Sequence, residues 1–362
     1  MKKIRLLAVL ALLVLPFVQI SAQERKLVLY TFEEMFPQSV LDDFKRDKGI
    51  TVEIVAFDLN EDIYNALEGG DVCGLAIADD YIVDSLISNG LAQKLNRSKI
   101  RNYANINPFF QHQFYDKNDE YTIPYGAGIQ TIVYDPAKVG NMVITGYTDL
   151  WNSRFKGSLG IIGNYRVVNG MALKVLGHSY NTESDSDITA AGRRLTALAP
   201  NIRLIQDINL DEALCNGEIS AAVMYTSEVT KAKMRKPELK VVFPKEGIGF
   251  GIMAALIPSS ASAADADAAH QFLDYILDPQ RGARCFEELG YYCTFLASER
   301  YIKREFLPYI TLPRAEEPGS AKNSGYLPTY KYMDFEFIES ISNEVDRKHH
   351  EIWIDFNVAI GR

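Results

Sequence analysis

A regular alternation of short apolar runs and amphipathic stretches occupies the first part of this chain. Runs typical of β-strands alternate with segments whose apolar residues recur at helical spacing, in the order Lys26–Tyr30 (strand), Val40–Phe44 (helix), Thr51–Phe57 (strand), Glu61–Leu67 (helix) and Leu75–Ala78 (strand). Strands that alternate with helices pair in parallel, because each helix carries the chain back to the end of the sheet at which the previous strand began. The order therefore predicts an α/β fold, a sheet with helices on both faces.

Two loops directly follow predicted strands of this sheet, and both carry polar and aromatic side chains. They are Thr31–Pro37, after the first strand, and Asp79–Tyr81, after the third. In open α/β sheets, ligands bind in the crevice outside the carboxyl ends of the strands. We therefore expect both loops to border a ligand site.

The first 22 residues have the pattern of a secretory signal peptide. Three basic residues precede the apolar run Leu6–Val18, and a processing site is expected at Ile20–Ala22. The run is too short for a permanent membrane span, although an uncleaved signal anchor is the alternative. We expect a periplasmic protein without a lipid anchor, because no cysteine lies near the processing site.

The remaining chain is long and acidic. About 340 residues exceed what one hydrophobic core usually holds, so two domains are expected. Over the whole sequence, signal peptide included, acidic residues outnumber basic ones by 47 to 38, which gives a formal net charge of −9. This balance argues against a nucleic-acid partner, which requires a basic surface, and it does not repel a cationic ligand.

Four cysteines permit up to two disulfides in an exported protein: Cys73, Cys215, Cys285 and Cys293. Cys285 and Cys293 form the best local pair, at the end of a predicted helix. Free buried thiols are the open alternative, because cysteine packs as a small hydrophobe. The cysteine spacing matches no zinc-ligand set, and we expect neither a metal nor another cofactor.

The middle and end of the chain continue the mixed pattern. Around Tyr121–Asp135 a long extended segment is expected. Further elements are expected at Leu159–Ile162 (strand), Val167–Leu176 (helix), Thr189–Leu198 (helix), Ala221–Tyr225 (strand), Lys240–Phe243 (strand), Ala263–Leu277 (helix), Pro313–Gly325 (surface loop) and in C-terminal helices that contain Phe335–Ile341 and Ile352–Phe356.

Five short motifs, in this order, resemble segments of one known family. They are Lys26–Pro37, Thr122–Gly126, Tyr147–Ser158 (with Asp149-Leu150-Trp151), Phe243–Gly247 and Phe272–Pro279. The family is that of the periplasmic spermidine/putrescine-binding proteins of ABC importers. The resemblance runs from about residue 26 to 300. It implies a type II periplasmic binding protein with two α/β lobes, each a mixed sheet flanked by helices, and a ligand in the cleft between them.

The resemblance also implies a domain plan and a function. Residues 23–127 and 252–305 would form the first lobe, and residues 128–251 the second, with C-terminal helices in residues 306–362 packing across the lobes. The protein would be a monomeric receptor that captures a polyamine by hinge closure and delivers it to an inner-membrane permease. A different small solute, or a sensory or surface receptor without transport, remains open.

A polyamine requires aromatic faces along its alkyl chain and a carboxylate at each ammonium. The family's first loop implies a stacking role for Phe32 and an acid role for Glu34, although Met35 replaces the family's aromatic residue. After the third strand, Tyr81 keeps the tyrosine of the family's Ser–x–Tyr ligand loop, and Asp79 stands at its serine and adds a negative charge. In the second half of the chain, the resemblance assigns ligand-facing rings to Tyr225 and Tyr291, and only one of Tyr291 and Tyr292 is expected to face the ligand.

Several positions depart from the family pattern where acids are expected. Asn164 and Val167 replace two acids of the second lobe, and Arg166 lies between them. In the glycine-rich strand, Gly251-Ile252-Met253 replaces a Trp–x–Asp. Either Glu34, Asp79 and Asp80 supply the missing carboxylates, or the solute has a neutral or anionic end near Asn164 and Arg166.

Structural roles are the alternatives for some of these residues. Phe32 and Tyr225 could pack in a core, and Asn164 could be a turn residue. Asp79 and Asp80 could cap the helix expected from Tyr81, and for Asp80 we expect capping rather than ligand contact.

Enzyme motifs are weak in this chain. Gly247–Gly251 lacks the strand and helix that surround a dinucleotide-binding loop. His349-His350-Glu351 could suggest a metal site, but the other histidines are scattered, so a solvated helix face is expected. We therefore expect no enzymatic activity.

Overall fold

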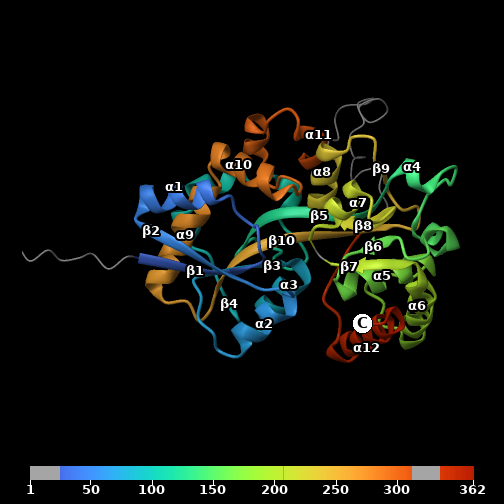
Figure 1. Cartoon of the computed structure of the whole chain (residues 1–362). Coiled ribbons are helices and arrows are strands. Elements are labelled where there is room, and N and C mark those ends of the chain that lie inside the picture. The colour runs from blue at the N-terminus through green and yellow to red at the C-terminus, as the bar shows by residue number, and fades with distance from the viewer. Residues whose placement is uncertain (1–24, 207, 312–334) are drawn as a thin grey trace, which may run out of the picture.

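The computed structural model describes residues 25–206, 208–311 and 335–362. Figure 1 shows two groups of strands, each flanked by helices, with the amino-terminal group in blue and the second group in green and yellow. The predicted signal peptide and the predicted loop Pro313–Gly325 lie outside the described residues. Among the residues described, no helix combines the length and apolarity that crossing a membrane requires.

The amino-terminal group contains the parallel strands that the alternation predicts. Its elements are β1 (Arg25–Thr31), α1 (Gln38–Lys48), β2 (Ile50–Ala56), α2 (Asn60–Glu68), β3 (Leu75–Asp79), α3 (Asp80–Ser88) and β4 (Ala92–Gln93). β1 pairs in parallel with β2 on one side and β3 on the other. α1 buries Val40, Leu41 and Phe44, and it ends at Gly49, whose φ of 66° is readily adopted only by glycine.

Two long strands join the groups, as the sequence predicts. β5 (Thr122–Tyr134) and β10 (Ile248–Pro258) pair antiparallel with each other. β10 also pairs with β3, and β5 continues into pairing with β8 (Ala221–Tyr225). The strand order along the sheet is therefore β2-β1-β3-β10-β5-β8, followed by two further strands of the second group. Because both β5 and β10 run between the groups, a change in the relative position of the groups must bend two paired strands.

The second group repeats the α/β pattern. Its other elements are α4 (Pro136–Val139), β6 (Leu159–Ile161), α5 (Tyr165–Val175), α6 (Asp185–Leu198), β7 (Ile202–Ile205), α7 (Leu210–Asn216), α8 (Thr226–Arg235) and β9 (Lys240–Val242). β6 pairs in parallel with both β7 and β8. α5 and α6 begin earlier than predicted, because side-chain oxygens of Asn164 and Ser184 cap their first turns. The predicted two-lobed α/β fold is confirmed, and the residue bounds of the lobes stay a prediction.

The last part of the chain departs from prediction at one element. It contains α9 (Ala263–Ile276), α10 (Pro279–Leu289), α11 (Leu307–Ile310), β11 (Phe335–Phe337) and α12 (Asn343–Ile360). A helix containing Phe335–Ile341 was predicted wrongly, because this segment begins as β11, which pairs with β10. Alternation explains the strand: the rings of Phe335 and Phe337 both contact Phe250, at centroid distances of 5.2 and 5.4 Å. α12 contains the predicted helical segment Ile352–Phe356 and packs against α5 and α6.

The cysteines and one histidine also correct the sequence predictions. All four cysteines are free thiols, so the predicted Cys285–Cys293 disulfide is wrong and the alternative of buried thiols holds for this pair. Burial raises the pKa of Cys285 to about 12, so its thiol stays protonated. His349, expected on a solvated helix face, is fully buried between α12 and α5, where Asn169 donates to it.

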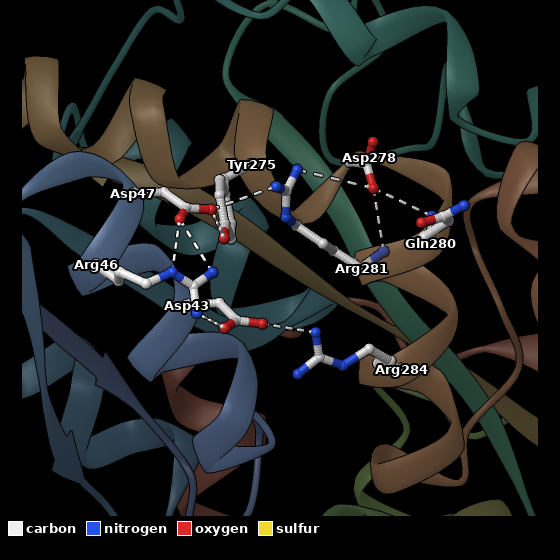
Figure 2. A network of polar contacts seen from close by, with 8 residues as sticks. All are labelled: Asp43, Arg46, Asp47, Tyr275, Asp278, Gln280, Arg281 and Arg284. Atoms are coloured by element: carbon white, nitrogen blue, oxygen red, sulfur yellow. Dashed lines mark hydrogen bonds and ion pairs between the residues drawn. The ribbon is translucent and has the colours of Figure 1, made fainter.

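Figure 2 shows a polar network that fixes α1 against α9 and α10. The carboxylate of Asp43 accepts hydrogen bonds from Arg46 of its own helix and from Arg284 of α10. One turn later, Asp47 accepts a 2.7 Å hydrogen bond from the hydroxyl of Tyr275 in α9. Partly exposed ion pairs add little stability individually, but this network fixes the orientation of α1, which follows the loop Thr31–Pro37.

Candidate ligand-binding cleft

A cleft of about 350 Å³ lies between the two groups of strands. Its walls come from the loops at the carboxyl ends of β1, β2, β3, β6 and β8, together with β5, β10 and the end of α10. All seven sequence-predicted site residues line this one cleft: Phe32, Glu34, Asp79, Tyr81, Asn164, Tyr225 and Tyr291. The structure therefore brings together residues that are far apart in the sequence.

The loop after β1 presents Phe32 and Glu34 to the cleft. Glu34 adopts a left-handed backbone with φ of 56°, which is uncommon for a residue with a side chain and marks a sharp turn here. Its carboxylate lies 3.1 Å from the ammonium of Lys231 in α8. Met35 also borders the cleft but is mostly buried, and its carbonyl accepts a hydrogen bond from Tyr125. Glu34 therefore joins the first group of strands to the second.

Asp79 and Asp80 have different roles from those expected. Asp79, not Asp80, is the residue before the first turn of α3, and the Asp79 side chain forms no capping hydrogen bond to that helix. Asp79 accepts a hydrogen bond of 2.8 Å from the amide of Asn60. Asp80 is buried, and its carboxylate accepts the backbone N–H groups of Tyr81 and Ile252. Asp80 is therefore not the N-cap residue, although its carboxylate does accept one first-turn N–H, and it ties α3 to the crossing strand β10.

Burial also affects the pKa of Asp80. Loss of solvent, with a further contribution from the charge of Asp79, raises this pKa well above its ordinary value.

An acid that the sequence analysis missed lies opposite α5. Glu61, in the first turn of α2, accepts hydrogen bonds from the hydroxyls of Tyr81 (3.1 Å) and Tyr165 (2.9 Å). Tyr165 belongs to α5, so this contact also spans the cleft, and its hydroxyl lies 2.7 Å from Asp346 of α12. The loops after β1 and β3 were selected because ligands bind outside the carboxyl ends of strands. The same principle, applied to the carboxyl end of β2, would have indicated Glu61.

The start of α5 places Asn164 and Arg166 at the cleft. The side-chain oxygen of Asn164 accepts the N–H of Val167 at 3.2 Å and caps the helix. Arg166 is only 2 % exposed, and one of its terminal nitrogens donates to the carbonyl of Glu339 at 3.0 Å. Its guanidinium lies 5.5 Å from the ring centroid of Tyr81.

Two tyrosines form an aromatic pair on the other side of the cleft. Tyr225 ends β8, and Tyr291 follows α10, with ring centroids 6.5 Å apart. The ring of Tyr291 packs directly on Gly128 of β5, where a Cβ atom would lie 2.7 Å from a ring carbon. Because Gly128 has no side chain, the ring of Tyr291 fits against β5 at this position. The neighbouring Tyr292 is fully buried, so only one of the two tyrosines lines the cleft, as expected.

Glu228 is a second missed acid. It lies in the first turn of α8, 2 % exposed, and accepts the backbone N–H of Asp211 at 3.2 Å. Burial and the charge of Asp211 raise the pKa of Glu228 to about 7. Lys231, one turn further along α8, has its ammonium 3.6 Å from the Glu228 carboxylate.

Acidic side chains dominate the cleft walls. Among the described residues that line the cleft, eight are acidic and two are basic. The acidic ones are Glu33, Glu34, Asp58, Glu61, Asp79, Asp80, Glu228 and Glu288, and the basic ones are Arg166 and Lys231. This excess gives the cleft a negative potential that attracts cations. The described residues contain no cluster of three or more metal-ligating side chains.

Comparison with known families gives a match over most of the chain. Residues 39–300 match the model of a family described as "Bacterial extracellular solute-binding protein". The spermidine/putrescine-binding periplasmic protein of Escherichia coli K12 is 30 % identical over 293 residues, which cover 80 % of this chain and 84 % of that protein.

Solved structures show the same fold. A putative spermidine/putrescine ABC transporter from Listeria monocytogenes superposes with a TM-score of 0.83 at 22 % identity, covering 92 % of this chain and 99 % of that one. The spermidine/putrescine ABC transporter substrate-binding protein of Streptococcus pneumoniae gives a TM-score of 0.74 at 24 % identity, covering 93 % and 99 %.

Proposed function

The chain belongs to the bacterial extracellular solute-binding proteins, and on this premise we propose that it captures a polyamine and delivers it to the permease of an ABC importer. The observation that carries the proposal is the excess of eight acidic over two basic residues around one cleft. Ammonium groups form strong, charge-assisted hydrogen bonds with carboxylates, and a cation buried without such a partner costs several kcal/mol. The name of the similar E. coli protein, a spermidine/putrescine-binding protein, supports the same solute class.

Individual residues take roles that follow from their positions. Phe32, Tyr225 and Tyr291 offer aromatic faces to the alkyl chain and its ammonium groups, at roughly 0.5–2 kcal/mol each. Glu34 and Asp79 pair with an ammonium end. Tyr81 and Asn164 supply polar contacts, the latter from the second group of strands.

Closure about the two crossing strands explains capture. The first lobe would be built from residues 23–127 and 252–305, and the second from residues 128–251. The two lobes would rotate relative to each other about β5 and β10. A ligand that contacts both lobes has higher affinity for the closed state and shifts the population toward it. Contacts across the cleft, such as Glu61 with Tyr165, favour the same state.

The cellular setting follows from the family. The receptor would act as an exported periplasmic monomer, without catalytic activity, and the closed form would dock on the inner-membrane permease. Residues 306–362 would pack across the lobes and complete the second one.

Isothermal titration of ligand-stripped mature protein with spermidine and putrescine tests the proposal. We expect dissociation constants in the micromolar range or below for at least one of these amines. 1,4-Butanediol serves as the matched control ligand, because it has the length of putrescine without its charges, and it should give no binding. An absence of heat and of thermal stabilisation with both amines would refute the polyamine assignment.

A further inference from the structure

The first turn of α5 presents hydrogen-bond donors to the cleft. The side-chain oxygen of Asn164 already accepts the N–H of Val167, whereas its NH2 group has no hydrogen-bond partner among the described residues. Arg166 carries only donors. Its Nε is fully buried without a hydrogen-bond partner, and the terminal nitrogen that donates to the Glu339 carbonyl also donates to the side-chain oxygen of Asn181 at 3.4 Å.

The helix itself adds positive potential at this place. Four helices that begin at the cleft are α2, α3, α5 and α8, and each directs the positive end of its dipole toward it. The first turns of α2, α3 and α8 each contain an acid beside the cleft, namely Glu61, Asp80 and Glu228. The first turn of α5 contains no acid. It contains the Arg166 side chain instead.

An ammonium group is a poor fit for this end of the cleft. It has donors only, so it would leave the Asn164 amide and the Arg166 Nε without acceptors, and it would face a buried positive charge. An oxygen with lone pairs satisfies both groups. A buried guanidinium pairs most favourably with such an acceptor in the planar, two-pronged arrangement that carboxylates and carbonyl groups allow.

We propose that the α5 end of the cleft binds an acceptor oxygen of the solute, so that the ligand is an amine whose far end carries a carboxylate or an amide carbonyl. This inference rests on one part of the proposed function, the capture of an ammonium group by the acidic residues of the cleft, and it changes the chemistry expected at the other end of the solute. The acidic residues elsewhere in the cleft hold the ammonium, and Asn164 with Arg166 holds the oxygen. The two sources of that oxygen, an ω-amino acid and an N-acylated diamine, share the same recognition chemistry.

Titration with three ligands of similar length tests this specificity. The ligands are putrescine, with two ammonium ends, N-acetylputrescine, with one amide end, and 4-aminobutyrate, with one carboxylate end. At least one of the two oxygen-ended amines should bind at least tenfold more tightly than putrescine, and the one preferred identifies the source of the oxygen. Putrescine binding as tightly as both, or more tightly, would overturn this inference and leave the proposed function intact. No binding of any amine, spermidine included, would overturn both.

The Asn164→Asp variant provides an internal test. Aspartate caps helices as well as asparagine, so α5 keeps its cap, while the outward NH2 donor becomes a charged acceptor. We expect putrescine to gain at least fivefold in affinity and the oxygen-ended amines to lose by a similar factor. Ser184→Asp makes the equivalent cap change at α6, outside the cleft, and should alter neither affinity. If Asn164→Asp keeps the wild-type ratio of affinities for putrescine and the oxygen-ended amines, the role assigned to Asn164 is wrong.

Arg166→Met tests the guanidinium separately. Methionine fills a similar apolar volume and removes the donors, so the preference for oxygen-ended amines should fall at least tenfold. Because Arg166 also donates to the Glu339 carbonyl, the melting temperature and circular dichroism of the variant are measured first. A folded variant that keeps the full preference would refute the role of Arg166.

Discussion

The ammonium of Lys231 lies 3.1 Å from the carboxylate of Glu34, so the protein supplies its own cation to an acid of the ligand cleft. Glu34 comes from the loop after β1, and Lys231 from α8 in the second group of strands. The same ammonium lies 3.6 Å from Glu228. An incoming ammonium therefore competes with Lys231 for these two acids.

Replacing Lys231 with methionine should strengthen amine binding. The change keeps most of the alkyl stem and leaves Glu34 and Glu228 to the ligand, and a partly exposed ion pair of this kind is worth up to about 1 kcal/mol. We expect putrescine affinity to rise by about threefold to tenfold, measured by titration calorimetry. Lys233→Met is the matched control on the same helix, because Lys233 donates to the Leu239 carbonyl and does not line the cleft. Equal or weaker binding by Lys231→Met would show that the lysine does not compete with the ligand.

Glu228 should release a proton when an amine binds near neutral pH. Its pKa of about 7 leaves the carboxyl partly protonated at pH 7, and a nearby ammonium favours the charged form. The binding enthalpy at pH 7 should therefore depend on the ionisation enthalpy of the buffer, as measured in phosphate and in Tris. In Glu228→Gln the dependence should disappear. Identical enthalpies for the wild type in both buffers would contradict the prediction.

The raised pKa of Glu228 also makes the stability of the free protein depend on pH. Its folded-state pKa is raised above the ordinary value of 4.5, so the folded state binds more protons than the unfolded one between these values. The stabilisation that protonation gives is complete below pH 4.5 and is lost as the pH rises through about 7. Removal of the carboxyl in Glu228→Gln removes this part of the pH dependence.

The fold could be predicted largely from sequence because its signals are local. The alternation from Lys26 to Tyr81 specified strands and helices, and an extended segment indicated β5, whereas the return at β10 was implied by the family resemblance. The failure at Phe335–Ile341 has a non-local cause: the short run Phe335-Glu336-Phe337 becomes a strand only because β10 offers an open edge beside Ile248–Phe250. Local pattern carries no information on such a partner.

The site could be predicted only where a family motif or a strand end marked it. Phe32 and Tyr81 were found by those signals and line the cleft. Glu228 and Tyr165 were missed because they lie inside the first turns of helices, where an acid or a tyrosine also has ordinary structural roles. The raised pKa of Asp80 results from its burial in the folded protein, which no local pattern expresses.

Tyr225→Ala should weaken amine binding at least tenfold without a large loss of stability. The ring lines the cleft beside Tyr291 and is partly exposed, so its removal deprives the ligand of a stacking face and leaves no sealed cavity in the core. Calorimetry gives the affinity, and urea unfolding gives the stability. Tyr301→Ala is the control, because Tyr301 is 42 % exposed and does not line the cleft. Unchanged affinity in Tyr225→Ala would remove Tyr225 from the site.

His349 should make the protein less stable in mild acid. Burial, with the nearby charges of Arg166 and His350, lowers the pKa of His349 from 6.5 to about 3. Asn169 donates to its Nδ1, so the neutral ring carries its proton on Nε2, which has no partner among the described residues. Below pH 6.5 the unfolded chain binds a proton at this ring and the folded one does not.

The sign and size of the effect follow from this difference. Stability from the neutral ring is fully present above pH 6.5 and is lost as the pH falls toward 3, by at most about 1.4 kcal/mol per pH unit. Urea unfolding at pH 7, 5.5 and 4.5 measures the slope. His349→Asn keeps an acceptor near Asn169 and cannot be protonated, so its stability should fall less steeply over this range. The exposed His112, changed to asparagine, should leave the slope nearly unchanged. Equal slopes for the wild type and His349→Asn would show that His349 does not control acid stability.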